Sequence, residues 1–199
     1  VGNVNATSTV SGPVSGAASG LVKRGAGVLQ LTGVNAYTGD TTIGAGTFVL
    51  SGAATLGQGN YTGALALAAG SLFQFSSSAV QNMAGVISGA GQVKQSGAGV
   101  LSLSGANTYS GGTVLAAGEL EAASAGALGQ TGDLAFSGGT LRYSSNNQTD
   151  YSARLSGTAN AYRVDTAGQA VTFGTALAGS TASLAKLGLG TLTLTGQNT

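Results

Sequence analysis

The sequence of 199 residues contains no cysteine, no histidine and no tryptophan, and it has a single proline. Without cysteine, neither a disulfide framework nor thiol chemistry is possible. Without histidine, the chain lacks the general base of Ser-His-Asp and Cys-His sites and also the commonest metal ligand. These absences exclude the most frequent forms of nucleophilic catalysis and disfavour metal catalysis.

Charge is also scarce, because charged residues make up only 7% of the chain and the formal net charge is +1. Such a chain has no field strong enough to attract nucleic acid or an anionic membrane surface. No segment approaches the roughly 18 consecutive apolar residues of a membrane-spanning helix. Residues 1–25 have neither the basic head nor the unbroken apolar stretch of a signal peptide. We therefore expect no nucleic-acid partner and no direct membrane insertion.

Glycine, by contrast, is abundant, with 36 residues, and apolar residues make up 42% of the chain. Aromatic residues are only 6%, so the core has to be built mainly from Leu, Val, Ile and Ala packed at close range. Side chains of this size fill a core efficiently only when they are arranged regularly. The composition therefore favours a repetitive architecture.

The chain does repeat itself. The segment LVKRGAGVLQLTGVNAYTGDTTIGAGTFVL at 21–50 returns as QVKQSGAGVLSLSGANTYSGGTVLAAGELE at 92–121, and a truncated copy, AKLGLGTLTLTGQNT, occupies 185–199. Matched positions are 72 residues apart between the first two copies and 91 apart between the next two. The difference of roughly 19 residues indicates one additional turn of a solenoid. We predict that 1–199 is a single β-helical unit and a fragment of a larger protein.

The secondary structure follows from alternation. Leucine alternates with small polar residues at 27–32, 100–104 and 192–195, which is the period-two pattern of a half-buried strand. Further short strands are predicted at 41–43, 47–50, 64–67, 71–75, 113–115, 119–121, 134–136, 140–143 and 171–173. Helical periodicity is not sustained anywhere.

The connections between these runs favour a parallel coil over a sandwich. Hairpin turns of the Asn-Gly or Asp-Gly type do not occur in the chain. In a parallel coil each strand pairs with its counterpart one turn above and below, so like residues stack about 4.8 Å apart. Turns of about 18 to 24 residues would give about 8 to 11 turns in a rod.

The repeat resembles the passenger-associated transport repeat, or autotransporter-associated β-strand repeat, of bacterial autotransporters, which are type V secreted proteins. The second copy departs from the first by one inserted residue after Lys94, and Phe48 of the first copy stands where the second has Leu120. The repeat positions that carry the resemblance are Lys23, Gly25, Gly27, Leu29, Leu31, Gly33, Asn35, Tyr37, Gly39, Thr41 and Gly46; Lys94, Gly97, Gly99, Leu101, Leu103, Gly105, Asn107, Tyr109, Gly111, Thr113 and Gly118; and Lys186, Gly188, Gly190, Leu192, Leu194, Gly196 and Asn198.

The resemblance implies a right-handed parallel β-helix that belongs to the passenger domain of an autotransporter. It also implies export through the periplasm and the outer membrane of a Gram-negative bacterium, by way of the protein's own C-terminal β-barrel, which would lie beyond Thr199. The expected function is that of a non-enzymatic stalk whose repeats promote secretion and folding and which presents effector regions at the cell surface. No cofactor is implied.

Two other functions remain open. The first is an adhesin or self-association surface that mediates attachment, aggregation or biofilm formation. The second is an enzyme, for which Glu119 and Glu121 are the candidate acids, because they alternate on one predicted strand about 7 Å apart. Their counterparts in the first copy are Thr47 and Val49, so we interpret them as variable surface positions. The acids do not follow a calcium-repeat pattern, and we expect no metal site.

Charge and aromatic rings are most concentrated between residues 142 and 165. Because Tyr and Arg are favoured at recognition hot spots, this segment is the candidate partner-binding region, although a larger solvated turn would also explain it. The candidate residues are Arg142, Tyr143, Tyr151, Arg154, Tyr162 and Arg163.

The remaining repeat residues have structural interpretations. We expect glycines such as Gly25 and Gly97 to allow positive φ at sharp corners. The asparagines are expected to close corners through bonds to the backbone, with Tyr37 and Tyr109 packed over the same corner. The repeat lysines are expected to extend along the surface with solvated ammonium groups.

Overall fold

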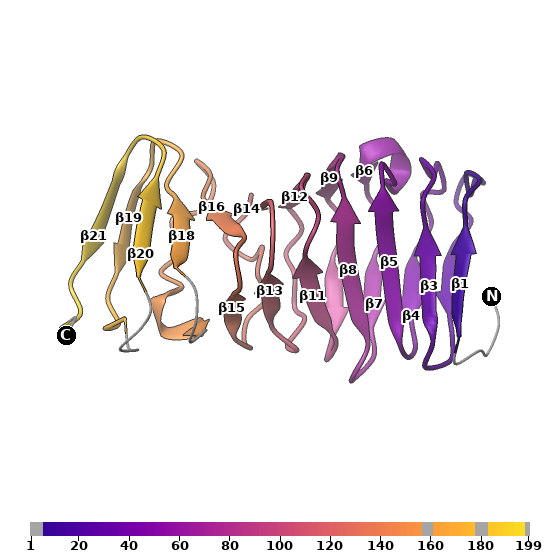
Figure 1. The fold of residues 1–199 in the computed structure, drawn as a ribbon, viewed down its shortest axis with the longest axis horizontal. Helices are drawn as coiled ribbons and strands as arrows, with labels where there is room; N and C mark the ends of the chain where they lie inside the picture. Colours follow the sequence, from indigo (N-terminus) through magenta and orange to yellow (C-terminus); the bar gives the residue numbers. More distant parts are fainter. Residues whose placement is uncertain (1–5, 157–160, 178–182, 198–199) are drawn as a thin grey trace.

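The structure, a computed structural model, describes residues 6–156, 161–177 and 183–197. The chain winds into about nine stacked parallel coils that form a β-solenoid, and the described residues contain no α-helix (Figure 1). Short 3-10 turns are present at η1 (Gly57–Gly59) and η2 (Ser152–Arg154). The predicted all-β parallel architecture is confirmed, whereas the right-handed sense stays a prediction.

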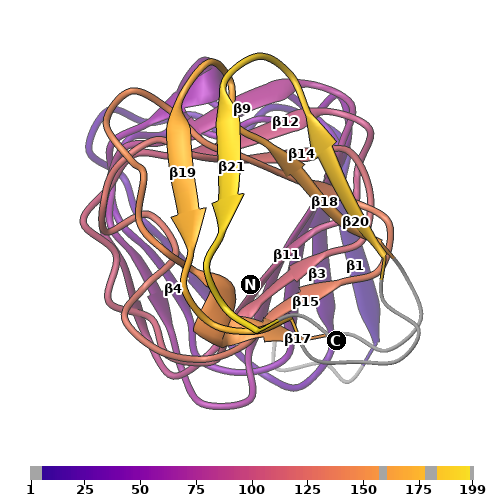
Figure 2. The same ribbon diagram turned by 90° about the vertical axis from the view of Figure 1, so that its left-hand side faces the viewer.

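Four parallel sheets line the sides of the rod, and they surround a common interior (Figure 2). The eight-stranded sheet consists of β1 (Thr7–Val10), β3 (Val28–Leu31), β5 (Thr47–Gly52), β8 (Leu72–Ser77), β11 (Gln92–Gln95), β13 (Thr113–Leu115), β15 (Leu134–Phe136) and β17 (Leu155–Ser156). The seven-stranded sheet consists of β6 (Asn60–Tyr61), β9 (Val80–Met83), β12 (Val100–Leu103), β14 (Glu119–Ala122), β16 (Thr140–Arg142), β18 (Tyr162–Asp165) and β20 (Leu184–Leu187).

The third side of the coil carries two smaller sheets. The four-stranded sheet consists of β2 (Leu21–Lys23), β4 (Thr41–Ile43), β7 (Leu65–Leu67) and β10 (Ile87–Gly89). The two-stranded sheet consists of β19 (Ala170–Phe173) and β21 (Thr191–Leu194). Each of these sheets follows the seven-stranded sheet in the course of a coil, because β10 comes directly after β9 and β19 directly after β18.

The core is a set of columns that run along the rod. Leu31 pairs with Leu50 and Leu50 with Phe75, and all three side chains are buried. Parallel pairing in register places each inward side chain directly over the one in the previous coil. Polar side chains interrupt the apolar columns at a few points, as Gln95 does after Phe75 and Thr113 does after Val93. The columns therefore keep the inward position from coil to coil, but they do not keep the same residue type throughout.

The copies of the repeat do not occupy the same side of the rod. The leucine strand of the first copy is β3 in the eight-stranded sheet, that of the second is β12 in the seven-stranded sheet, and that of the third is β21 in the two-stranded sheet. Each of these three copies is thus displaced by one side of the coil relative to the one before it among the three.

The pairing registers explain the two spacings. Three coils in the eight-stranded sheet carry the chain from Leu29 to Val93, and Leu101 follows on the next sheet. Four coils in the seven-stranded sheet carry it from Leu101 to Lys186, and Leu192 follows on the next. The additional turn predicted from the change of spacing is therefore present between the second and third copies.

Candidate functional site

The contacts between successive coils are the part of the molecule where the repeat residues act, beginning with asparagine. Asn35 is fully buried, its Oδ1 accepts from the amide of Val14 at 2.9 Å, and its Nδ2 donates to the carbonyl of Thr55 at 2.9 Å. These partners belong to the preceding and the following coil. The predicted bonds to the backbone are present, and they extend beyond the corner to both neighbouring coils.

Asn107 repeats this arrangement on a different side of the rod. Its Oδ1 accepts from the amide of Ile87 at 2.7 Å, and its Nδ2 donates to the carbonyl of Ala127 at 2.7 Å. The side chain is 2% exposed. The third predicted asparagine, Asn198, lies outside the described residues.

The repeat tyrosines lie inside the rod. The hydroxyl of Tyr37 is 2.9 Å from Oγ1 of Thr41, and that of Tyr109 is 2.7 Å from Oγ1 of Thr113. Burial raises the pKa of both tyrosines above the ordinary value. The hydroxyl-bearing partner four residues on could have been recognised in the sequence, because both copies carry the same Tyr-to-Thr spacing.

The repeat lysine caps an inner corner of backbone carbonyls. Lys23 is only 3% exposed, and its Nζ donates to the carbonyls of Gly25 and Ala45. Burial lowers the pKa of Lys23. Lys186 makes the same contact with the carbonyl of Gly188, at 2.7 Å. The prediction of solvated surface lysines is therefore wrong for Lys23, because the corner provides only acceptors and a buried ammonium satisfies them.

In the second copy the corner residue is Gln95, not Lys94. Nε2 of Gln95 donates to the carbonyls of Gly97 and Gly99, at 3.2 and 2.7 Å. Lys94 occupies an outward-facing, partly exposed position on β11. The inserted residue in this copy therefore precedes the corner position, which corrects the alignment of Lys94 with Lys23.

Close packing between coils explains more of the repeat glycines than positive φ does. Gly25 has the expected positive φ of 78°. Gly97 and Gly99 do not have positive φ, but a Cβ on either one would collide with a backbone carbonyl of the previous coil. At Gly118 both constraints act, because φ is 56° and a Cβ would collide with the carbonyl oxygen of Gly97.

The three tyrosines among the candidate partner-binding residues are internal. Tyr143, Tyr151 and Tyr162 are at most 2% exposed. Tyr162 packs edge-on against Phe136, with ring centroids 5.5 Å apart. Tyr143 and Tyr151 pack together with centroids 6.0 Å apart. The alternation of β18 places Tyr162 inward, so these rings are core and do not form the expected recognition cluster.

Arg154 is also a structural residue. Its guanidinium donates to the carbonyls of Leu128, Gly129, Thr131 and Gly132, at 2.8 to 3.1 Å. These carbonyls belong to the loop of the preceding coil. The planar fork of donors suits such a cluster of acceptors. The sequence contains no signal that distinguishes this partly exposed structural arginine from one that faces only solvent.

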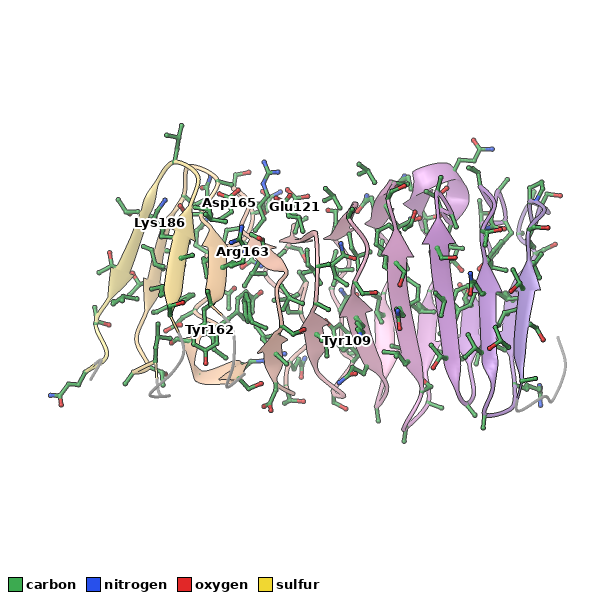
Figure 3. All side chains as sticks on the ribbon, in the orientation of Figure 1. Tyr109, Glu121, Tyr162, Arg163, Asp165 and Lys186 are labelled. Carbon is green, nitrogen blue, oxygen red and sulfur yellow. The ribbon has the colours of Figure 1, made fainter. Side chains whose placement is uncertain are left out.

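Arg142 and Arg163 lie on the outer face of the seven-stranded sheet, where Arg142 is partly exposed and Arg163 is exposed. Nη1 of Arg142 lies 3.0 Å from Oε1 of Glu119, and this ion pair raises the pKa of Arg142. Nε of Arg163 donates to Oγ1 of Thr140. Figure 3 shows Arg163 with Glu121 and Asp165 on the same part of the rod. The surface group therefore mixes both signs of charge.

No three His, Cys, Asp or Glu side chains within 6–156, 161–177 and 183–197 gather as metal ligands would. In the same part of the chain, no helix has the length and apolarity required to cross a membrane.

Comparison with known families identifies the repeat. The passenger-associated-transport-repeat family matches residues 21–50, 43–72, 93–122 and 184–199. Neither the curated proteins nor the solved structures gave a match.

Three of these matches coincide, to within one residue at each end, with the copies found in the sequence, and the match at 43–72 is additional. The additional copy lies one coil above the first, with Phe48 over Leu29 and Leu67 over Ile43. It was missed because Phe48 replaces the leucine and η1 lengthens its coil. With passenger-associated transport repeats distributed along a solenoid of parallel coils, the chain has the repeats and the fold of a β-helical segment of an autotransporter passenger domain.

Proposed function

We propose that this segment is a non-enzymatic stalk whose repeats promote folding and secretion of the passenger and which presents effector regions at the cell surface. One observation carries the proposal: the most regular repeat residues point inward and bond to neighbouring coils. Leu29, Leu31, Leu101 and Leu103 are at most 3% exposed, and Asn35 and Asn107 connect three coils each. Residues in such positions act on the stability of the coil.

The rotation of the copies supports the same proposal. The copies at 21–50 and 43–72 share the eight-stranded sheet, whereas the copies at 93–122 and 184–199 have their leucine strands on two other sheets. A rigid partner that bound one side of the folded rod would therefore not meet all the copies in one orientation. The repeat therefore suits a role in building the coil better than a role as a docking surface on the finished rod.

Folding of stacked coils also provides a source of free energy for export. In a solenoid each unit contacts only its neighbours, so coils can form one after another as the chain emerges. Burial of apolar side chains in each new coil opposes backward movement of the chain. We propose that the passenger's own C-terminal outer-membrane β-barrel is the export partner and that the passenger is secreted or displayed at the surface of a Gram-negative bacterium.

The test is a quadruple substitution, Leu29→Ser, Leu31→Ser, Leu101→Ser and Leu103→Ser, in the full-length parent protein. Each change removes a buried leucine and introduces a hydroxyl into the core, at a cost of about 2 to 5 kcal/mol per site. We expect the passenger to stall during export or to be degraded. Surface labelling of intact cells, compared with total passenger in the cell, measures the outcome.

The matched control changes outward residues of the eight-stranded sheet: Gln30→Ala, Ser51→Ala, Gln74→Ala and Ser96→Ala. These side chains hydrogen-bond to one another on the outside, as Gln30 does with Ser51 and Gln74 with Ser96. We expect the control to be displayed normally. Normal display of the leucine variant would contradict the proposal.

The same control separates the stalk from an adhesin or self-association surface. The observation that favours this second function is the ladder of uncharged amide and hydroxyl side chains on the outer face, extended by the 2.7 Å contact of Ser76 with Ser96. If this face mediates attachment, aggregation or biofilm formation, the control variant will be displayed but will lose that activity. A stalk without such a role will retain it.

We propose no catalytic role for the acidic pair. The Glu119 carboxylate is paired with Arg142 in the neighbouring strand, and both side chains are partly exposed. An exposed pair of this kind is an ordinary feature of a solvated sheet.

A further inference from the structure

The asparagine corners do more than close a turn, because each side chain replaces a backbone group in the contact between coils. Oδ1 of Asn107 accepts from the amide of Ile87 in the preceding coil, where a main-chain carbonyl would otherwise serve. Nδ2 of the same side chain donates to the carbonyl of Ala127 in the following coil. One buried side-chain amide thus takes part in two successive junctions, which are the contacts of its coil with the preceding and with the following coil.

Asn35 has the same pair of bonds although it lies on another side of the rod. Its Oδ1 serves the amide of Val14 and its Nδ2 the carbonyl of Thr55. A buried side-chain amide left without one of its partners destabilises the fold, because the desolvation cost of the unpaired group is no longer compensated by a hydrogen bond. The bond to the preceding coil and the bond to the following coil therefore hold the same side chain in one position.

We propose that Asn35 and Asn107 are coupling residues, which make each coil depend on both neighbours so that the solenoid closes in overlapping blocks of three coils. Release of the bond on one side frees the carboxamide to rotate, and the bond on the other side is then lost as well. This proposal deepens the proposed function, because it assigns the cooperativity of stalk folding to particular side chains.

The substitution Asn107→Asp separates the two bonds. The carboxylate keeps an oxygen that can accept from Ile87, but it has no donor for Ala127 and places negative charge against that carbonyl. The measurement is native-state hydrogen exchange on the purified chain. Two backbone amides report on the following junction. The amide of Asn107 donates to the carbonyl of Gly126, and the amide of Ala123 donates to the carbonyl of Leu103.

Two other backbone amides report on the preceding junction. The amide of Ile87 donates to Oδ1 of Asn107, and the amide of Thr108 donates to the carbonyl of Ile87. Coupling predicts that Asn107→Asp accelerates exchange about tenfold at both junctions, since the lost bond is of ordinary strength. Acceleration at the following junction alone would show that the asparagine is only a local cap and would overturn the proposal.

Asn82→Asp is the matched control. Asn82 also spans three coils, but its bonds go to the side chains of Asn60 and Ser104 on the outer face. We expect its exchange pattern to stay within about twofold of the parent chain. Equal acceleration in Asn82→Asp and Asn107→Asp would overturn the proposal, because it would reflect added charge alone.

Asn35→Asp provides a second reading, with the amides of Asn35 and Val14 as the reporters of its two junctions. If Asn107→Asp unfolds the whole chain, the test is read from Asn35→Asp, and faster exchange at only one of its two junctions would overturn the proposal. Exchange on the purified chain is independent of export. Failure of this test therefore leaves the secretion proposal standing, and the reverse also holds.

Discussion

Gln95 lies completely buried at the corner that Lys23 occupies in the first copy of the repeat. Its Nε2 meets carbonyl oxygens, while its Oε1 has no hydrogen-bond partner among the described residues. The corner offers acceptors only, so the acceptor of the glutamine side chain finds no donor there. Lysine has three donors and no acceptor.

We expect Gln95→Lys to raise the free energy of unfolding by about 1 kcal/mol, because it removes an unpaired buried acceptor and supplies a charged donor to the carbonyls. The desolvation of the ammonium opposes this gain, and the same arrangement at Lys23 shows that the corner accommodates it. Chemical denaturation of the purified chain measures the change. Lys94→Gln, on the outer side of the same strand, is the control and should have little effect. A less stable Gln95→Lys protein would contradict the prediction.

At the residue scale, the sequence predicted positions better than it predicted roles. The repeat identified Asn35, Tyr37 and Lys23 as structural, and all three are buried in contacts between coils. It could not show that Lys94 points outward, because one inserted residue reverses the side on which each side chain of a strand lies. It also could not show that Arg154 is a cap, because the carbonyls that it binds lie 22 to 26 residues away in the chain.

Among the elements, alternation was a reliable guide where leucine and valine mark the inner face. The strands predicted at 41–43, 113–115 and 134–136 have the predicted bounds. Strand β9 was missed because its inward residue Gln81 is polar, although it is fully buried and bonded to the backbone of Leu56. Strand β18 was missed because Arg163 and Asp165 on its outer face resemble a solvated turn.

Glycine at the corners between elements allows a test of close packing. Gly118 and Gly70 both have positive φ, of 56° and 72°, but only Gly118 lies against the backbone of the previous coil. A Cβ at Gly70 would have nothing within 4 Å. The two sites therefore share the conformational penalty and differ in the steric one.

We expect Gly70→Ala to lower the free energy of unfolding by about 1 to 2 kcal/mol, the cost of a left-handed conformation for a residue with a Cβ. Gly118→Ala should cost at least about twice as much, because the neighbouring coil has to move as well. Thermal or chemical denaturation of both variants measures the difference. Equal losses at the two sites would show that conformation alone requires glycine at Gly118.

For the whole molecule, buried tyrosines determine how stability responds to alkaline pH. Burial raises the pKa of Tyr37, Tyr61, Tyr109, Tyr143 and Tyr151 in the folded chain. In the unfolded chain these groups ionise near the ordinary value of about 10. The folded state therefore binds more protons above that pH, and the stability present below it is lost as pH rises.

We expect the free energy of unfolding to be constant between about pH 8 and 9 and to fall steeply above about pH 10. Lys23 acts in the opposite direction, because its lowered pKa favours the folded state as pH approaches 10.5. One lysine opposes five tyrosines, so the fall should dominate. Denaturation at fixed ionic strength measures the profile, and Tyr109→Phe should make the slope shallower. A free energy that does not change from pH 9 to 11 would contradict the prediction.

The rotation of the repeat from sheet to sheet has a mechanical consequence for the rod. When a beam bends, one side is stretched while the opposite side is compressed. Because the asparagine corners of Asn35 and Asn107 lie on different sides, these contacts between coils oppose bending in more than one direction. A rod stiffened on more than one side keeps its length under a sideways load better than a rod stiffened on one side alone.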